Sequence, residues 1–365
     1  MKILIAFGTR PEAIKMAPVI LELKKRKSIK TVICVTGQHK EMLQQVLSTF
    51  QIVPDFDLSI MKEGQTLFDI TNAVLLQIKP VLEKEKPDLV LVHGDTSTTF
   101  SVALACYYLK IPVGHVEAGL RTYDIYSPFP EEFNRQAVSL ISKYNFAPTE
   151  LAKENLIQEK KDPSGIFVTG NTAIDALKYT VRPDFDSDDL IWAKNSRLLL
   201  LTAHRRENIG EPMHHIFKAI RRIVETFDDV KVIYPIHKNP IVRSIAEAEF
   251  AGNERIRLIE PLDVVEFHNY MAHSYFILTD SGGVQEEAPS LGKPVLVLRE
   301  VTERPEGISA GTLRIVGTSE AGVFKAAKEL LENRNEYEKM SKAKNPYGDG
   351  FAAVRIANIL CGDLK

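Results

Sequence analysis

The sequence predicts an α/β protein built from two Rossmann-like, doubly wound domains. Short apolar, β-rich runs alternate with helical stretches along the whole chain, and such near-continuous apolar strands are typical of parallel sheets covered on both faces. The strand-like runs form two sets of six. A chain of 365 residues is also long enough for about two domains.

Each half of the chain supplies one set of expected strands. In the first half they are Ile3–Phe7, Thr31–Val35, Leu89–His93, Val113–Val116, Asn145–Ala147 and Ile166–Val168. In the second half they are Leu198–Thr202, Lys231–Ile236, Ile256–Ile259, Tyr275–Leu278, Val295–Leu298 and Leu313–Val316.

The segment Lys178–Asp189 contains Pro183 and several Asp residues, and it is the weakest stretch for regular structure. It is therefore expected to hold the linker, or to follow it directly. We predict an N-terminal domain over 1–175, a C-terminal domain over 176–347, and a final helix in 348–365 that could pack back on the first domain.

Composition argues against several classes of function. The net charge of −2 provides no basic surface for nucleic acid or an anionic membrane. No window approaches 18 apolar residues and the N-terminus lacks a signal peptide's h-region, so we expect a cytoplasmic protein with no membrane partner. Cys34, Cys106 and Cys361 form no CxxC pair and are expected to be reduced thiols.

Two loops that follow strands are expected to bind anions. Gly8-Thr9-Arg10-Pro11-Glu12 follows the first strand, and Pro11 suits the first turn of a helix, where its missing N–H costs nothing. Asp280-Ser281-Gly282-Gly283 opens a second helix. Because free N–H groups and the helix dipole favour an anion at such a start, we predict a phosphorylated ligand held between the two domains.

Carboxylates are expected on the ligand side of the first sheet. Ligands of open parallel sheets bind beyond the carboxyl ends of the strands, where Asp95 and Glu117 lie, and Glu131 directly precedes a helix. Carboxyl groups around one crevice can have their pKa values pushed apart, which would supply an acid and a base. Alternatively, Asp95 caps the next helix and Glu131 only occupies a first turn.

The second half carries polar groups at corresponding strand ends. His204 follows Leu198–Thr202 and could donate to a phosphate oxygen or move a proton, although a lone His is more often structural. Glu287 could accept hydrogen bonds from ribose hydroxyls. The remaining candidates for diphosphate or sugar are Ser281, Gly282, Gly283, Arg304 and Glu306, the last two also being open to surface ion pairing.

Sequence motifs for common cofactors are missing. No G-x-G-x-x-G follows the first strand, and the chain has neither G-x-x-x-x-G-K-[ST] nor H-E-x-x-H. We therefore expect no cofactor and no catalytic metal.

Seven motifs occur in an order that resembles a known enzyme family. They are Gly8-Thr9-Arg10-Pro11-Glu12, His93-Gly94-Asp95, His115-Val116-Glu117-Ala118-Gly119-Leu120-Arg121, Pro130-Glu131-Glu132, His204-Arg205-Arg206-Glu207-Asn208, Asp280-Ser281-Gly282-Gly283-Val284-Gln285-Glu286-Glu287 and Thr302-Glu303-Arg304-Pro305-Glu306-Gly307. Each is weak alone, but the ordered set spans nearly the whole chain. The chain resembles the bacterial non-hydrolysing UDP-N-acetylglucosamine 2-epimerases.

This resemblance implies a GT-B-type fold with a cleft between two domains, a homodimer, and interconversion of UDP-GlcNAc and UDP-ManNAc for envelope or capsule polysaccharides. The implied catalytic residues are Asp95, Glu117, Glu131 and His204. The implied substrate-binding residues are Arg10, Lys15, Arg135, Leu262, Phe267, Ser281, Gly282, Gly283, Glu287 and Arg304.

An elimination suits these residue types. C2–H of the sugar is not next to a carbonyl, so simple deprotonation is too costly. A base would remove the C2 proton as UDP leaves C1, and UDP would add back to the 2-acetamidoglucal after a proton arrives on the opposite face. Carboxylates would move the protons, and donors would stabilise charge on the diphosphate.

The resemblance also implies a regulatory UDP-GlcNAc site. Two positions depart from its pattern, with Glu41 where relatives tend to have Gln and Gly64 where they tend to have Arg. Losing a guanidinium and gaining a carboxylate weakens diphosphate binding, so we expect weakened or absent activation. The implied residues of this site are Gln38, His39, Gln65, Arg205 and His237.

Three alternatives remain open at this point. One is an epimerase of another 2-acetamido UDP-sugar. Another is a GT-B glycosyltransferase, which would need an acceptor groove. No feature of the sequence indicates such a groove. The third is a non-catalytic UDP-sugar sensor, which would not need three carboxylates at the crevice.

Overall fold

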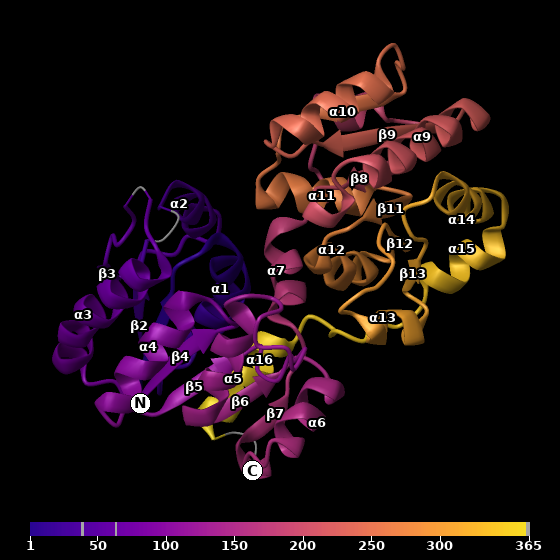
Figure 1. Cartoon of the computed structure of the whole chain (residues 1–365). Coiled ribbons are helices and arrows are strands. Elements are labelled where there is room, and N and C mark those ends of the chain that lie inside the picture. The colour runs from indigo at the N-terminus through magenta and orange to yellow at the C-terminus, as the bar shows by residue number, and fades with distance from the viewer. Residues whose placement is uncertain (38–39, 63, 363–365) are drawn as a thin grey trace. The chain divides into compact units, whose positions relative to one another are not determined.

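A computed structural model describes residues 1–37, 40–62 and 64–362 of the chain. Contacts divide it into two compact units: unit 1 contains Met1–Tyr179 together with the C-terminal segment from Gly348, and unit 2 contains Thr180–Tyr347 (Figure 1). Each unit has one parallel sheet with helices against it, which confirms the predicted α/β class with two doubly wound sheets.

Unit 1 holds a seven-stranded sheet in the order β3-β2-β1-β4-β5-β6-β7, with every neighbouring pair parallel. The expectation of six strands was wrong here, because β3 has only two residues and is too short to produce an apolar run. The strands are β1 (Lys2–Phe7), β2 (Lys30–Val35), β3 (Phe56–Asp57), β4 (Leu89–His93), β5 (Val113–Val116), β6 (Ser142–Ala147) and β7 (Ile166–Val168).

Helices cover both faces of the unit 1 sheet (Figure 1). Leu4, Val32 and Val90 belong to one buried cluster with apolar side chains of α3, α4 and α5. Helix α1 contacts α2 and α16. The C-terminal helix, α16, therefore packs on unit 1. The helices are α1 (Arg10–Lys24), α2 (Lys40–Thr49), α3 (Leu67–Glu85), α4 (Ser97–Tyr108), α5 (Glu131–Ile141), α6 (Glu150–Gln158), α7 (Thr172–Thr180) and α16 (Ala352–Cys361).

Unit 2 holds a six-stranded sheet in the order β10-β9-β8-β11-β12-β13, again parallel throughout. The expected strands differ from the observed ones by at most one residue at either end, because fully buried strands give continuous apolar runs. They are β8 (Arg197–Thr202), β9 (Val230–Pro235), β10 (Ile256–Ile259), β11 (Phe276–Thr279), β12 (Val295–Val297) and β13 (Leu313–Ile315).

The helices of unit 2 bury one apolar face each. On α9, Met213, Phe217, Ile220 and Val224 recur at helical spacing and join the core with β8 and β9. The helices are α8 (Asp188–Trp192), α9 (Glu211–Thr226), α10 (Pro240–Phe250), α11 (Val264–His273), α12 (Gly282–Glu287), α13 (Pro305–Ala310), α14 (Glu320–Glu332) and α15 (Arg334–Ser341). None of the helices in the described ranges is long and apolar enough to cross a membrane.

Strand order reverses once in each sheet, between β1 and β4 in unit 1 and between β8 and β11 in unit 2. At such a switch point the two crossovers leave toward opposite faces of the sheet, and the loops after the strands separate to leave room for a ligand. Gly8 and Gly94 directly follow β1 and β4 and belong to two of the quoted motifs. Those that contain His204 and Asp280 follow β8 and β11, so both switch points carry predicted site residues.

Candidate functional site

A buried carboxylate organises the switch point of unit 1. Glu12 Oε2 accepts hydrogen bonds from the backbone N–H groups of Gly8 (3.0 Å) and Thr9 (2.7 Å), which completes a capping box at the start of α1. Its Oε1 accepts from the hydroxyls of Thr96 (2.8 Å) and Thr99 (3.1 Å), after β4. Burial raises the pKa of Glu12, and the hydrogen bonds from Thr96, Gly8 and Thr9 oppose that shift. Glu12 thus joins the loop that leads to Arg10 with the loop that carries Asp95.

Sequence reasoning gave Glu12 no role, although it stands in the quoted motif. A Thr followed three residues later by Glu is the signature of a capping box, so the cap itself could have been found. The bonds to Thr96 and Thr99 depend on which strands are neighbours, and the local pattern contains no signal for them.

Glu117 lies between a lysine and a histidine. Lys15, on α1, donates a hydrogen bond to Glu117 Oε2, and His93 Nε2 lies 3.6 Å from the same oxygen. Burial lowers the pKa of His93 to about 4, so its imidazole is neutral at pH 7. The backbone of Glu117 has a φ of 63°, a left-handed conformation that is uncommon for a residue other than glycine. The position of the carboxylate is therefore fixed by its ion pair with Lys15.

Asp95 is tied to the start of α5. Arg135 donates one hydrogen bond to the Asp95 carboxylate and a second, of 3.2 Å, to Glu132. The side-chain amide of Asn134 donates to the backbone carbonyl of Asp95 at 2.8 Å. The alternative that Asp95 caps α4 is wrong, because Thr96 is the N-cap. Glu131 is the half-buried first residue of α5, so Asp95 and Glu131 flank the contact between this helix and the loop after β4.

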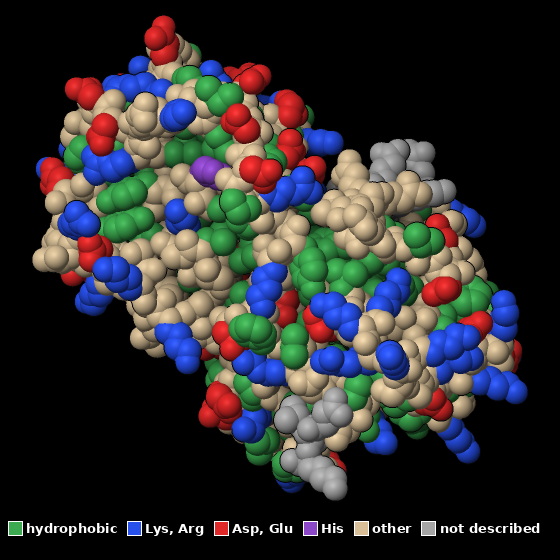
Figure 2. Space-filling model, turned by 180° about the vertical axis from the view of Figure 1, so that it is seen from behind, with side chains coloured by type: hydrophobic (Ala, Val, Ile, Leu, Met, Phe, Trp, Pro, Cys, Tyr) green, Lys and Arg blue, Asp and Glu red, His purple; other side chains and the backbone are tan. Residues whose placement is uncertain are grey.

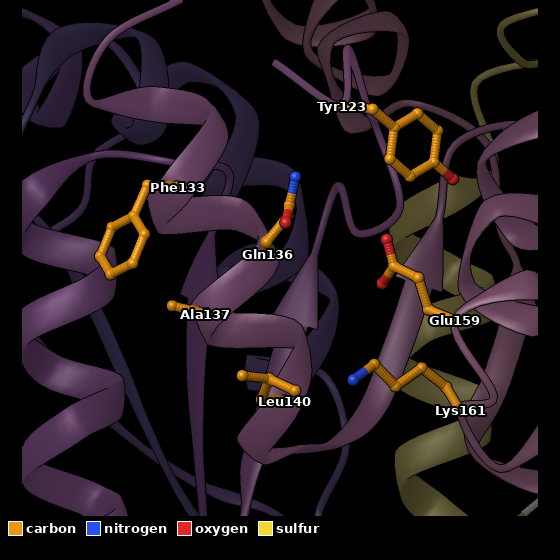
Figure 3. A pocket seen from close by; sticks show the side chains of 7 residues that line it. All are labelled: Tyr123, Phe133, Gln136, Ala137, Leu140, Glu159 and Lys161. Carbon is orange, nitrogen blue, oxygen red and sulfur yellow. The ribbon is translucent and has the colours of Figure 1, made fainter. Parts of the chain in front are cut away.

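Arg121, at the end of the same motif as Glu117, is structural. Its side chain is fully buried and forms a bidentate pair with Glu159, at 2.6 and 2.9 Å. Glu159 also lines an open pocket of about 500 Å³ beside α5, together with Phe133 and Leu140 (Figure 3). No residue that lines this pocket is a predicted site residue.

A second buried carboxylate organises the switch point of unit 2. The Asp280 side chain is fully buried, and its Oδ2 accepts from the backbone N–H groups of His204 and Arg205, both at 2.8 Å, and from the side chain of Asn208 at 3.1 Å. Asp280 Oδ1 lies 3.3 Å from His204 Nδ1. The His204 ring stacks on His237, with ring centroids 5.6 Å apart. Burial lowers the pKa of His204, while Asp280 opposes that shift.

Two arginines border the start of α12. A Cβ atom placed on Gly282 would lie 3.6 Å from Arg304 Nη2 and 4.0 Å from Arg205 Nη2. Arg304 also pairs with Glu286, and their side chains are only 18% and 4% exposed, so the alternative of a surface ion pair is wrong for this contact. Guanidinium groups and free backbone N–H groups at one helix start suit a diphosphate. The structure therefore brings Arg205, predicted for a regulatory site, beside Gly282 and Arg304, predicted for the substrate.

The other candidates in unit 2 lie on the helices around this region. Glu287 Oε2 is 3.5 Å from His268 Nε2, on α11. Phe267 is also on α11, and Leu262 lies in the loop before it, while Glu306 is in the first turn of α13. Ser281 is the N-cap residue of α12, and its side chain makes no cap bond to this helix.

The predicted regulatory residues are only partly described. Gln38 and His39 lie outside the described residues. Gln65, in unit 1, donates from Nε2 to the carbonyl of Ile60 at 2.6 Å, and Gly64 beside it has a φ of 71°. Arg205 and His237 are in unit 2. Arg205 lies beside Gly282, and His237 stacks on His204.

Within the described ranges, no three or more His, Cys, Asp or Glu side chains are arranged to hold a metal ion. Lys and Arg side chains are interspersed with Asp and Glu on the face seen in Figure 2. Because the net charge of the chain is only −2, the charge of a ligand must be met by local groups such as those at the two switch points.

Two doubly wound parallel sheets, each with charged residues at its switch point, define a two-domain α/β protein of the GT-B-like class. A family model described as UDP-N-acetylglucosamine 2-epimerase matches residues 21–361. The chain belongs to the UDP-N-acetylglucosamine 2-epimerase family.

Individual relatives match along the whole chain. The UDP-N-acetylglucosamine 2-epimerase of Bacillus subtilis is 59% identical over 99% of this chain and 95% of its own length. The S. aureus protein MnaA, solved with UDP, is 53% identical with a TM-score of 0.90, covering 98% of this chain and 95% of that one. The Neisseria meningitidis UDP-GlcNAc 2-epimerase, solved with UDP-GlcNAc, is 48% identical with a TM-score of 0.89, covering 99% and 100%.

The buried His93 makes folding stability depend on pH. Its pKa is about 4 in the folded protein against 6.5 for a free imidazole, so between these values the unfolded chain binds a proton that the folded one does not. The free energy of unfolding should therefore fall as the pH falls from 6.5 to 4. In His93→Gln this dependence should be shallower by up to about 1.4 kcal/mol per pH unit.

Urea unfolding at pH 5, 6 and 7 measures the effect. The exposed His215→Gln serves as the control and should keep the wild-type dependence. Equal pH dependence in His93→Gln and wild type would show that His93 is not held neutral by burial.

Proposed function

We propose that this chain interconverts UDP-N-acetylglucosamine and UDP-N-acetylmannosamine by inverting C2 of the sugar. Membership of the epimerase family supports this reaction. The proposal also draws support from the Neisseria meningitidis relative, which was solved with UDP-GlcNAc. The single structural observation that carries it is the content of the two switch points: carboxylates in unit 1, and guanidinium groups beside a histidine in unit 2.

Proton transfer is assigned to the carboxylates of unit 1. Asp95 and Glu117 follow β4 and β5 at the ligand end of this sheet, and Glu131 is the first residue of α5. Two of them are oriented by a cation, Asp95 by Arg135 and Glu117 by Lys15. A carboxylate whose position is fixed before the substrate arrives loses less entropy when it acts as a base. These groups would remove the C2 proton and return one on the opposite face.

Departure of UDP is assigned to unit 2. As the C1–O bond breaks, negative charge develops on the diphosphate, and donors that already point to that charge lower the barrier. Arg205, Arg304 and the start of α12 provide such donors, and His204 adds an imidazole. The glycal and UDP must both stay bound until UDP adds back, so water must be kept from them.

A related 2-acetamido UDP-sugar is the second candidate substrate, because the same elimination and re-addition of UDP would invert C2 of any such sugar. A non-catalytic sensor would not need the three carboxylates, and a glycosyltransferase would need an acceptor groove in addition to them. NMR of UDP-GlcNAc with the pure protein in D2O separates these cases. Epimerisation gives deuterium at C2 and a UDP-ManNAc signal, whereas free UDP alone indicates transfer or hydrolysis.

The substitutions Glu117→Gln and Glu131→Gln test the assignment of the proton-transfer groups. Each should lower kcat by about 10²–10⁴-fold, because an amide cannot exchange the C2 proton. The measurement is the rate of UDP-ManNAc formation together with deuterium incorporation at C2. Glu154→Gln, at an exposed position of α6, is the matched control and should behave as wild type. Normal turnover without deuterium at C2 in both variants contradicts the assignment.

We propose a homodimer formed through unit 1. Exposed apolar side chains gather on α3, α4 and α5, which contact one another in series: Phe68 is 86% exposed, Leu76 65%, Tyr108 67% and Leu140 74%. Exposed apolar side chains gathered on neighbouring helices often mark an interface. We also propose a cytoplasmic site of action, because all three cysteines are free and two of them are buried. Cell fractionation would check this location.

Light scattering after size exclusion should give twice the chain mass of 41.0 kDa. Leu140→Glu should shift the protein toward the monomer, because a carboxylate would be buried at the interface. Ile241→Glu, which replaces a 56% exposed apolar residue on α10, should not. A monomeric wild-type protein at micromolar concentration would rule out this assembly.

Activation by UDP-GlcNAc should be weak or absent. Glu41 and Gly64 replace the residue types that relatives tend to use for the regulatory diphosphate, and this removes one cation while adding one anion. Initial rates with UDP-ManNAc alone should therefore be close to those with added UDP-GlcNAc. The double variant Glu41→Gln, Gly64→Arg should gain activation of several-fold. A complete dependence of the wild-type rate on added UDP-GlcNAc is the opposing result.

A further inference from the structure

We propose that Asp280 is a positioning residue for His204, which it holds in the tautomer that carries its proton on Nδ1 and leaves Nε2 for the substrate. This inference rests on the proposed function, since His204 is taken to act on the departing diphosphate. Asp280 itself would touch neither sugar nor phosphate.

The geometry separates the two oxygens of Asp280. Oδ2 is occupied by three donors, the backbone N–H groups of His204 and Arg205 and the amide of Asn208. Oδ1 is buried and makes no hydrogen bond within the described part of the chain, yet it lies 3.3 Å from His204 Nδ1. A buried carboxylate oxygen with an open acceptor position is costly unless a donor reaches it. An Nδ1–H of His204 is the donor within reach.

The exposure of the Asp280 and His204 side chains also fits a positioning role for Asp280. Asp280 is fully buried, whereas 39% of the His204 side chain is exposed. The imidazole therefore has one edge against the carboxylate and part of its ring accessible. With Nδ1–H bound to Asp280, a second proton on Nε2 makes a donor that can reach a phosphate oxygen, as in other His–carboxylate pairs.

The other groups that face His204 set the charge balance. His237 is stacked on its ring, and both His237 and Arg205 lower the pKa of His204, as does burial. Asp280 and Glu207 raise it. Removal of the Asp280 charge should therefore lower the pKa of His204 further. If protonated His204 is the active form, activity falls as the pH rises through its pKa, and Asp280→Asn should move that fall to lower pH.

Asp280→Asn tests the proposal with little change of shape. Its amide oxygen can still accept from the two backbone N–H groups, which turns the NH2 group toward His204 Nδ1. The single proton of the ring then lies on Nε2, and the ring loses the carboxylate that stabilises its doubly protonated, positively charged form opposite the diphosphate. We expect kcat to fall about 100-fold or more, with a small change in KM, and the alkaline limb of the pH profile to shift down. In His204→Asn the added Asp280→Asn should cost little more, because both changes remove the same function.

Asp175→Asn is the matched control. Asp175 is also buried and accepts from two backbone N–H groups, those of Ala352 (3.1 Å) and Ala353 (2.9 Å), but it lies in unit 1 and packs against α16. This variant should lose stability in urea and keep the wild-type pH profile. If Asp280→Asn does the same, or if its effect adds fully to that of His204→Asn, Asp280 is only structural and the proposal is overturned.

A readout that needs no turnover keeps the two hypotheses apart. The 15N chemical shifts of the His204 ring should indicate Nδ1–H in the wild type and Nε2–H in Asp280→Asn. Lack of UDP-ManNAc formation by the wild type would defeat the proposed function, while this spectrum would still support or overturn the pairing. An Nε2–H tautomer in the wild type contradicts the pairing whatever the activity.

Discussion

A buried carboxylate at each switch point is the constraint on which the rest of the site depends. Glu12 in unit 1 accepts hydrogen bonds from backbone N–H groups in the loop after β1. Asp280 in unit 2 accepts them from the loop after β8. A buried acceptor without donors is costly, so each loop is fixed in the conformation that satisfies the carboxylate. Arg10, Asp95 and His204 take their positions from these loops.

The two units divide the charges between them. In unit 1, cations on helices, Lys15 and Arg135, hold carboxylates that stand at strand ends. In unit 2 the arrangement is inverted, with a carboxylate holding a histidine while arginines border a helix start. The first arrangement suits proton transfer and the second suits a departing anion. A chain with a net charge of −2 can thus handle a dianionic ligand through local groups alone.

Much of this could be predicted from the sequence because the strands are buried on both faces. Their continuous apolar runs located all of the strands except the two-residue β3, within a few residues at their ends. Motif order identified the family, since loops after parallel strands carry the ligand groups and the chain retains their order. Arg121 shows the limit of motifs, because a residue in a functional motif proved to be a buried structural partner of Glu159.

The sequence by itself determined the α/β class, the family and the kinds of side chain available for chemistry, because these follow from local periodicity and residue type. Only the tertiary structure decided which strands are neighbours, and therefore that the loops after β1 and β4, and those after β8 and β11, meet. It alone linked Glu12 to Thr96, 84 residues away, and Asp280 to His204, 76 residues away. Such contacts depend on strand order, and no local pattern of residues encodes it.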